Sequence, residues 1–182
     1  MGEMLLSRAS PLVSVRPYKA DGIAIAEAPD FAITQVAGFG KPFEKALATA
    51  MGKLPKSVGV AVAHDGRLLL RIAPEQFWII GPVGDAIALP AECLVTPLTS
   101  ARCRIALTGA KARQVLSRCA PIDFHHDAFT PGQFVMTGIH HTPVTFIVPV
   151  TIRSTFMHCA PSPFPCGNGL WMPHKDWRPD HA

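Results

Sequence analysis

The sequence has few charged residues and no block of like charges. Charged side chains make up 16% of its 182 residues, and the lysines and arginines behind the net charge of +4 are scattered singly. A nucleic-acid-binding surface needs clustered basic side chains, so we expect no nucleic acid as a partner. No uninterrupted apolar stretch approaches the roughly 20 residues of a membrane-spanning helix, and the N-terminal MGEMLLSRASPLVSV lacks the order of a signal peptide. These absences predict a cytoplasmic protein that does not contact a membrane.

Catalytic motifs and a disulfide pattern are also missing from the sequence. It contains no Gly-x-Ser-x-Gly, no Walker loop and no spaced pair of carboxylates. Its five cysteines are an odd number, and Cys93, Cys103 and Cys119 stand among apolar residues. This favours reduced thiols packed in a core over a disulfide framework. We therefore predict no catalytic, cofactor-binding or metal-binding residue on this chain.

Hydrophobic residues, in contrast, are plentiful: they make up 48% of the chain and fall into short strand-like runs. A chain this apolar also suggests that a partner covers part of its surface. Residues 1–22 are expected to form an extended arm, because Pro11 and Pro17 would interrupt a helix. Residues 23–150 are expected to form one α+β domain, in which mainly antiparallel strands pack against two or three helices on one face.

The expected domain shows a weak internal duplication. In each half, a strand leads into a helix and a hairpin follows, with turns at His64-Asp65-Gly66 and His140-His141. Setting Gly40 against Gly109 aligns the two helices, whose apolar residues recur at i, i+3, i+4 and i+7. The predicted buried positions are Phe43, Ala46, Leu47 and Ala50 in the first helix, which Gly52 ends, and Ala112, Val115, Leu116 and Cys119 in the second.

Several polar groups could carry chemistry, but each has a simpler explanation that we favour. His125-His126-Asp127 and His140-His141 could bind a metal ion, yet neighbouring histidines on a strand point to opposite faces, so surface positions are expected. Gly38-Phe39-Gly40 could present helix N–H groups to an anion, although a lone Gly-x-Gly is more often a simple turn.

Two further residues leave alternatives open. Asp123 could be a buried general base, or it could accept hydrogen bonds from backbone amides in the turn after Pro121. Trp78, in the segment PEQFWII, is predicted to be a core or interface aromatic residue.

The C-terminal residues 151–182 are predicted to form an irregular, proline-rich tail. Five prolines occur between Met157 and Ala182, and prolines remove backbone donors and break helices. The tail could instead bind a metal through Cys159, Cys166, His158 and His174, but the cysteine spacing differs from that of zinc knuckles.

The segment IALTGAKARQVLSRCAPIDFHHDAFTPGQFVMTGIHHTPVTFIV, from Ile105 to Val148, resembles the gamma subunit of heterotetrameric sarcosine oxidase. That subunit is similar to the folate-binding domains of the glycine-cleavage T-protein. The resemblance extends over roughly residues 24–150, with PEQFWIIGP in support. The shared positions are Gly109, Ala112-Arg113, Leu116, Pro121-Ile122-Asp123, Phe129 and Pro131-Gly132.

The resemblance implies a cytoplasmic complex that oxidatively demethylates sarcosine to glycine, with hydrogen peroxide and either formaldehyde or methylene-tetrahydrofolate as the other products. Its FAD, FMN, NAD, zinc and tetrahydrofolate are expected on the alpha, beta and delta subunits. The gamma subunit is expected to be structural, so we carry over no active-site residue. The alternatives are a free-standing T-protein-like folate-binding module and a small metal-binding protein that uses the tail.

The C-terminus departs from the family, whose members end with a strand and a Trp-rich amphipathic helix. One shifted reading frame that the codons from Thr151 onward permit spells HSIYVHALRTFAVSLWEWLVDA. We therefore hypothesise that the reading frame changed near Val150. If so, the tail should form neither a regular strand nor a helix, and the coding DNA across codons 145–170 tests the hypothesis.

Overall fold

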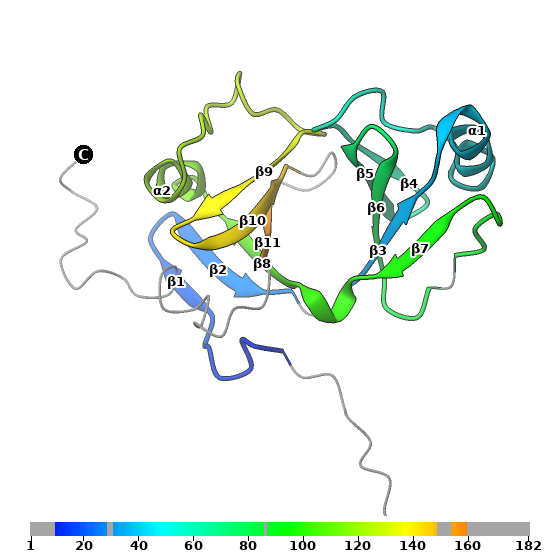
Figure 1. Ribbon diagram of the computed structural model, residues 1–182. Coiled ribbons are helices and arrows are strands. Elements are labelled where there is room, and N and C mark those ends of the chain that lie inside the picture. Colours follow the sequence, from blue (N-terminus) through cyan, green and yellow to red (C-terminus); the bar gives the residue numbers. More distant parts are fainter. Residues whose placement is uncertain (1–9, 29–30, 86, 149–153, 160–182) are drawn as a thin grey trace, which may run out of the picture.

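The computed structural model describes residues 10–28, 31–85 and 87–148, together with the backbone of residues 154–159. These residues form two antiparallel sheets (Figure 1). The six-stranded sheet has the order β1 (Tyr18–Ala20), β2 (Ile23–Glu27), β8 (Cys103–Thr108), β11 (Ser154–Cys159), β10 (Thr142–Ile147) and β9 (Phe134–Ile139). The five-stranded sheet has the order β4 (Ala61–His64), β5 (Arg67–Ala73), β6 (Gln76–Gly81), β3 (Ala32–Ala37) and β7 (Leu94–Pro97).

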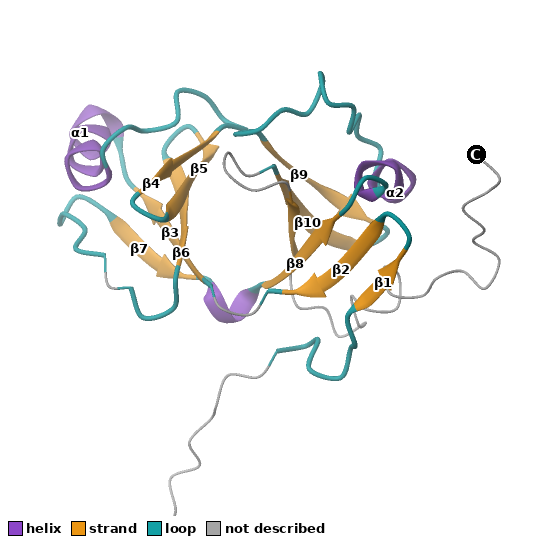
Figure 2. Ribbon diagram, turned by 180° about the vertical axis from the view of Figure 1, so that it is seen from behind, coloured by secondary structure: helices purple, strands orange, loops and turns teal. Residues whose placement is uncertain are grey.

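Each sheet carries one helix on its outer side (Figure 2), so the prediction that the helices lie against one common face was wrong. Helix α1 (Gly40–Met51) packs its apolar side on the five-stranded sheet through Val36, Leu69, Phe77 and Ile79. Helix α2 (Ala112–Cys119) packs on the six-stranded sheet. A short 3-10 helix, η1 (Thr99–Ala101), connects β7 to β8. Within the described residues no helix is long and apolar enough to cross a membrane.

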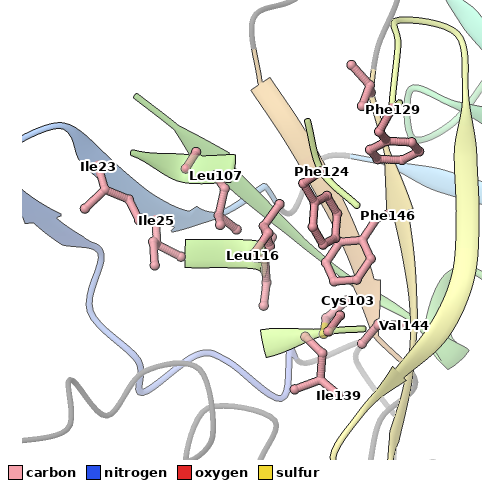
Figure 3. Close-up of a cluster of buried hydrophobic side chains, with 14 of the residues drawn as sticks. Ile23, Ile25, Cys103, Leu107, Leu116, Phe124, Phe129, Ile139, Val144 and Phe146 are labelled. Atoms are coloured by element: carbon pink, nitrogen blue, oxygen red, sulfur yellow. The ribbon is translucent and has the colours of Figure 1, made fainter. Parts of the chain in front are cut away.

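The core under α2 is built around aromatic side chains. The Phe124 ring meets the Phe146 ring edge-on at a centroid distance of 5.1 Å and the Phe129 ring at 5.7 Å. Leu116 of α2 lies beside this group (Figure 3). Edge-to-face pairs of buried rings add to the stability that their apolar area supplies.

A separate cluster of buried residues joins the two sheets. It brings Phe134 and Ile147 of the six-stranded sheet against Ile33, Leu70, Trp78 and Ile80 of the five-stranded sheet. Backbone hydrogen bonds continue this contact, from the Ala61 amide to the Gly132 carbonyl at 2.8 Å and from the Phe134 amide to the Gly59 carbonyl at 2.9 Å. The sheets therefore form one packed unit rather than two independent ones.

The predicted duplication is visible in the strand order. The first half, β3-α1-β4-β5-β6, arranges its strands as β4-β5-β6-β3, and the second half, β8-α2-β9-β10-β11, arranges its strands as β9-β10-β11-β8. Strand β7 occupies in one sheet the place that β2 occupies in the other. The aligned glycines Gly40 and Gly109 both have positive φ, 66° and 109°, where an L side chain is disfavoured.

The helix predictions were right in position and partly right in burial. α1 ends before Gly52, as expected, and buries Phe43 and Leu47. Its third buried side chain is Met51, whereas Ala50 is exposed. The stripe advances by four residues, so the long Met51 side chain reaches the core and the short alanine one position earlier does not.

The expectation that no regular strand follows Val150 was wrong. Residues 154–159 form β11, which pairs antiparallel with both β10 and β8 and so lies inside the six-stranded sheet. This is the closing strand that the duplication requires. The remainder of the tail, for which neither strand nor helix was expected, lies outside the described residues. The shifted-frame hypothesis stays a prediction about the DNA.

Strand β7 was not predicted. Residues 82–100 are rich in proline and alanine, and no strand was expected there. In the structure, residues 94–97 pair with β3. All four side chains of β7 are exposed, so no buried face marks the strand in the sequence.

Candidate functional site

An arginine–aromatic cluster lies where η1 and β8 approach the five-stranded sheet. Trp78 is 2% exposed, and its indole Nε1 donates a hydrogen bond to Oε1 of Gln35 at 3.1 Å. The guanidinium carbon of Arg102 lies 5.3 Å from the centre of the Trp78 ring. A cation over an aromatic face is stabilised by the ring quadrupole, most of all over tryptophan.

Within this cluster, one polar atom has an unused hydrogen-bonding capacity. Arg102 Nε is buried and has no hydrogen-bond partner among the described residues. A buried donor without an acceptor costs about 1–3 kcal/mol. A guanidinium nitrogen pairs best with a carboxylate or carbonyl oxygen, and none of the described residues places one beside Arg102 Nε.

A second arginine extends the same pattern. Arg104, two residues further along, has its guanidinium carbon 4.9 Å from the centre of the Phe31 ring, and its Nε donates to the Ala28 carbonyl at 3.3 Å. Arg102, just before β8, and Arg104, its second residue, thus both lie against aromatic rings from the first half of the chain. Their contacts help to hold the two halves together.

Arg113 organises the loop after α2. Its Nη1 donates to the carbonyl oxygens of Phe124 at 2.7 Å, Phe129 at 2.9 Å and His125 at 3.4 Å. The sequence marked Arg113 as a shared family position without assigning it a role. The structure shows that it closes the loop that carries Phe124 and Phe129 into the core.

Asp123 is exposed, which excludes the buried-base interpretation. Its Oδ1 accepts a hydrogen bond from the His125 amide at 2.8 Å, an arrangement that closes a turn over two residues. The second alternative given for Asp123, a turn-forming carboxylate, is confirmed.

The histidine groups are on the surface, as the favoured interpretation predicted. His125, His126 and Asp127 are exposed, and His125 Nδ1 lies 3.4 Å from Asp127 Oδ2. His140 and His141 form the exposed two-residue turn between β9 and β10. Within the part of the chain that the structure describes, no three His, Cys, Asp or Glu side chains gather to hold a metal ion.

Two of the four candidate ligands of the tail, Cys166 and His174, lie outside the described residues. The other two are His158 and Cys159, whose backbone forms the end of β11. The metal-binding alternative for the tail therefore stays a prediction.

The Gly38-Phe39-Gly40 segment is a turn whose glycines have structural reasons. A Cβ atom on Gly38 would lie 2.2 Å from the Phe43 ring, so only glycine lets α1 pack so closely. The Gly40 amide, at the start of α1, already donates to the Glu75 carboxylate. The chain's own carboxylate thus occupies the position where the sequence suggested an external anion.

The three described cysteines are free thiols, as predicted. Cys93 and Cys103 are buried and Cys119 is half-buried. Burial raises the pKa of the Cys93 and Cys119 thiols, which keeps them protonated and unreactive at neutral pH.

Comparison with known proteins gives a consistent picture. No protein-family model matches the chain. The sarcosine oxidase subunit gamma of Arthrobacter sp is 33% identical over 116 residues, which cover 58% of this chain and 56% of that protein. The sarcosine oxidase subunit gamma of Corynebacterium sp. (strain P-1) is 32% identical over 108 residues, covering 54% and 53%. The chain spans about half the length of the curated relatives it matches.

Two solved structures share the fold. A chain of the heterotetrameric sarcosine oxidase from Corynebacterium sp. U-96, in complex with pyrrole 2-carboxylate, matches with a TM-score of 0.73 and 23% identity over 83% of this chain and 86% of that one. The glycine cleavage system aminomethyltransferase T from Bartonella henselae matches with a TM-score of 0.54 and 18% identity over 78% and 42%. The predicted resemblance and the α+β, T-protein-like fold are confirmed.

Proposed function

We propose that this chain is the gamma subunit of a heterotetrameric sarcosine oxidase and that its role there is structural. The observation that carries the proposal is the 33% identity to a curated gamma subunit. The likeness of the whole fold to a chain of a sarcosine oxidase complex supports it independently. The complex would convert sarcosine, water and oxygen to glycine, formaldehyde and hydrogen peroxide, with the formaldehyde carbon captured when tetrahydrofolate is present.

A structural role accounts for the polar side chains that looked most chemical in the sequence. Glu75 caps α1, Asp123 closes a turn and Arg113 secures a loop. We accordingly assign the FAD, FMN, NAD, zinc and tetrahydrofolate of the complex to the partner subunits, alpha, beta and delta. We also assign the complex to the cytoplasm, which the free thiols of the three described cysteines support.

Co-purification tests this proposal. An affinity-tagged copy of the chain, expressed in its own host, should isolate flavin-containing partner subunits together with sarcosine-dependent production of hydrogen peroxide. The amount of flavin and the rate of hydrogen peroxide production that the tag recovers should both be proportional to the amount of chain. A colourless chain that purifies without any other subunit, under conditions in which the host oxidises sarcosine, would refute the proposal.

A free-standing folate-binding module is the second candidate. The fold of an aminomethyltransferase T supports it, as does the buried Nε of Arg102 without an acceptor. Calorimetric titration of the isolated chain with tetrahydrofolate tests this candidate. Binding that Arg102→Met abolishes and Arg118→Met preserves would favour it, because Arg118 is exposed on α2 and distant from the arginine–aromatic cluster in sequence. Absence of binding heat at saturating ligand would eliminate it.

A further inference from the structure

Strand β7 is an edge strand with unusually exposed apolar side chains. Within the part of the chain that the structure describes, β7 ends the five-stranded sheet, and both Leu94 and Val95, on opposite faces of the strand, are exposed, by 60% and 50%. Free sheet edges attract other strands, and proteins normally cover them or place charges there. None of the four residues of β7 is charged.

The other half of the molecule shows what covers the equivalent edge. Strand β2 holds the place that corresponds to β7, and the three-residue strand β1 is paired with its outer side, antiparallel to it. The pairs are Tyr18 with Ile25, Lys19 with Ala24 and Ala20 with Ile23. A short extended segment is therefore enough to cover this position of the fold.

The backbone of β7 has the groups that such a segment needs. The Leu98 amide donates to the Ile33 carbonyl at 2.8 Å, and hydrogen-bonded pairs alternate along an antiparallel ladder. The register then directs the backbone groups of Thr96 and Leu94 toward β3. The amide and carbonyl of Val95 and the carbonyl of Pro97 consequently point outward. Proline has no amide to leave unpaired there, so its position fits an edge.

Apolar surface continues beyond the strand at one end. Leu94 pairs with Ala37, and Phe39, two residues after Ala37, is 80% exposed. An exposed phenylalanine and leucine at the same end of a sheet, beside an open backbone edge, are typical of a surface that another chain covers.

We propose that the β7 edge, defined as Leu94–Pro97 together with Phe39, binds an extended segment of a partner subunit as an added antiparallel strand. The segment is short, hydrogen-bonds to Val95 and places apolar side chains beside Leu94 and Phe39. Its counterpart within this chain is β1 on β2. This inference rests on the proposed function, since it identifies the surface through which the chain joins its complex.

The test uses the full chain, co-expressed with the other subunits of the complex and recovered through a tag. Leu94→Lys introduces a charge at the edge, and Val95→Pro removes the outward amide without affecting a bond to β3. Val83→Lys is the matched control, because Val83 is 59% exposed in the loop after β6. We expect the edge variants to weaken assembly about tenfold or more and the control to change it less than about twofold.

The outcomes separate this inference from the proposed function. If the wild-type chain assembles and the edge variants assemble equally well, the β7 edge is not the docking surface, but the proposed function stands. If the wild-type chain recovers no partner subunit, the proposed function fails, and the inference fails with it. A free chain that dimerises through Leu94 and Val95 would also overturn the inference, because the occupant would then be a second copy.

Hydrogen exchange keeps the inference testable if an edge variant fails to fold. In the free wild-type chain the Val95 amide should exchange rapidly, because it points outward. In the assembled complex it should be protected at least about tenfold, while the amides of the exposed His140-His141 turn should not change. Equal exchange of Val95 in the two states would refute the added strand.

Discussion

Replacing Arg113 by Met should destabilise the protein by about 3 kcal/mol. The substitution keeps the aliphatic part of the side chain and removes the guanidinium that donates to three carbonyl groups of one loop. Two of these bonds, to Phe124 at 2.7 Å and Phe129 at 2.9 Å, are partly buried. Hydrogen bonds to a charged donor contribute about 1.5–3 kcal/mol each, and we take the lower value because water can partly replace a half-buried arginine. The third bond, 3.4 Å long and exposed, adds little.

Urea unfolding measures this loss. With a slope of about 2 kcal/mol per molar urea, the midpoint should fall by about 1.5 M. Arg113→Lys should lose about half as much, because an ammonium group can reach one of the two buried carbonyls but lacks the planar fork. The matched control is Arg118→Met on the same helix, where the side chain is exposed and the change should stay within about 0.5 kcal/mol. If Arg113→Met is no more destabilising than this control, the loop does not depend on the guanidinium.

Two further perturbations test the close packing and the surface electrostatics of the first half. Gly38→Ala should destabilise the protein by about 2 kcal/mol or more, because the added Cβ would lie 2.2 Å from the Phe43 ring. The control is Gly138→Ala, whose added Cβ would have its nearest neighbour at 3.7 Å, and this variant should be close to neutral in the same urea experiment. The hydrogen bonds from Arg67 hold the pKa of Asp85 below its ordinary value, so their stabilisation is present above about pH 4 and disappears as the pH falls through the folded-state pKa. The stability difference between the wild-type chain and Arg67→Gln should therefore vanish in acid, and a constant difference down to about pH 2 would contradict this.

Local sequence patterns were sufficient wherever the chain has one buried side. The spacing of Phe43 and Leu47 identified α1, because a period of 3.6 residues directly reflects which side chains face a core. Asp65-Gly66 identified the first hairpin, because Asp-Gly favours the tight turn between two strands. Strands β7 and β11 could not be found in this way. Every side chain of β7 is exposed, and β11 follows Val150, where the pattern that marks other strands is lost.

The same distinction between local patterns and tertiary packing applies to the polar side chains of the candidate site. The sequence correctly predicted a surface position for His125, and one of its two alternatives for Asp123, the turn-forming carboxylate, was right, since neighbouring residues and turn preferences determine such roles. It could not indicate that Arg102 lies over Trp78 or that Arg113 secures the loop ahead of it. Arg102 and Trp78 are 24 positions apart, and the packing of the second half on the first brings them together. Arg113 and the carbonyls that it contacts are 11 to 16 positions apart, and the folding of the loop back onto α2 brings them together.

By itself, the sequence determined the class of fold, the two aligned helices, the reduced thiols and the resemblance to a gamma subunit, because each depends on residue type and short-range spacing. The tertiary structure alone decided that the duplicated halves form two sheets, each with its own helix, and that β11 completes the second half. It also decided which edge is open among the described residues: β1 covers β2, while β7 in the equivalent place is paired there with β3 alone. Strand neighbours are set by long-range pairing, and no local pattern in Leu94–Pro97 records whether another strand lies beyond it.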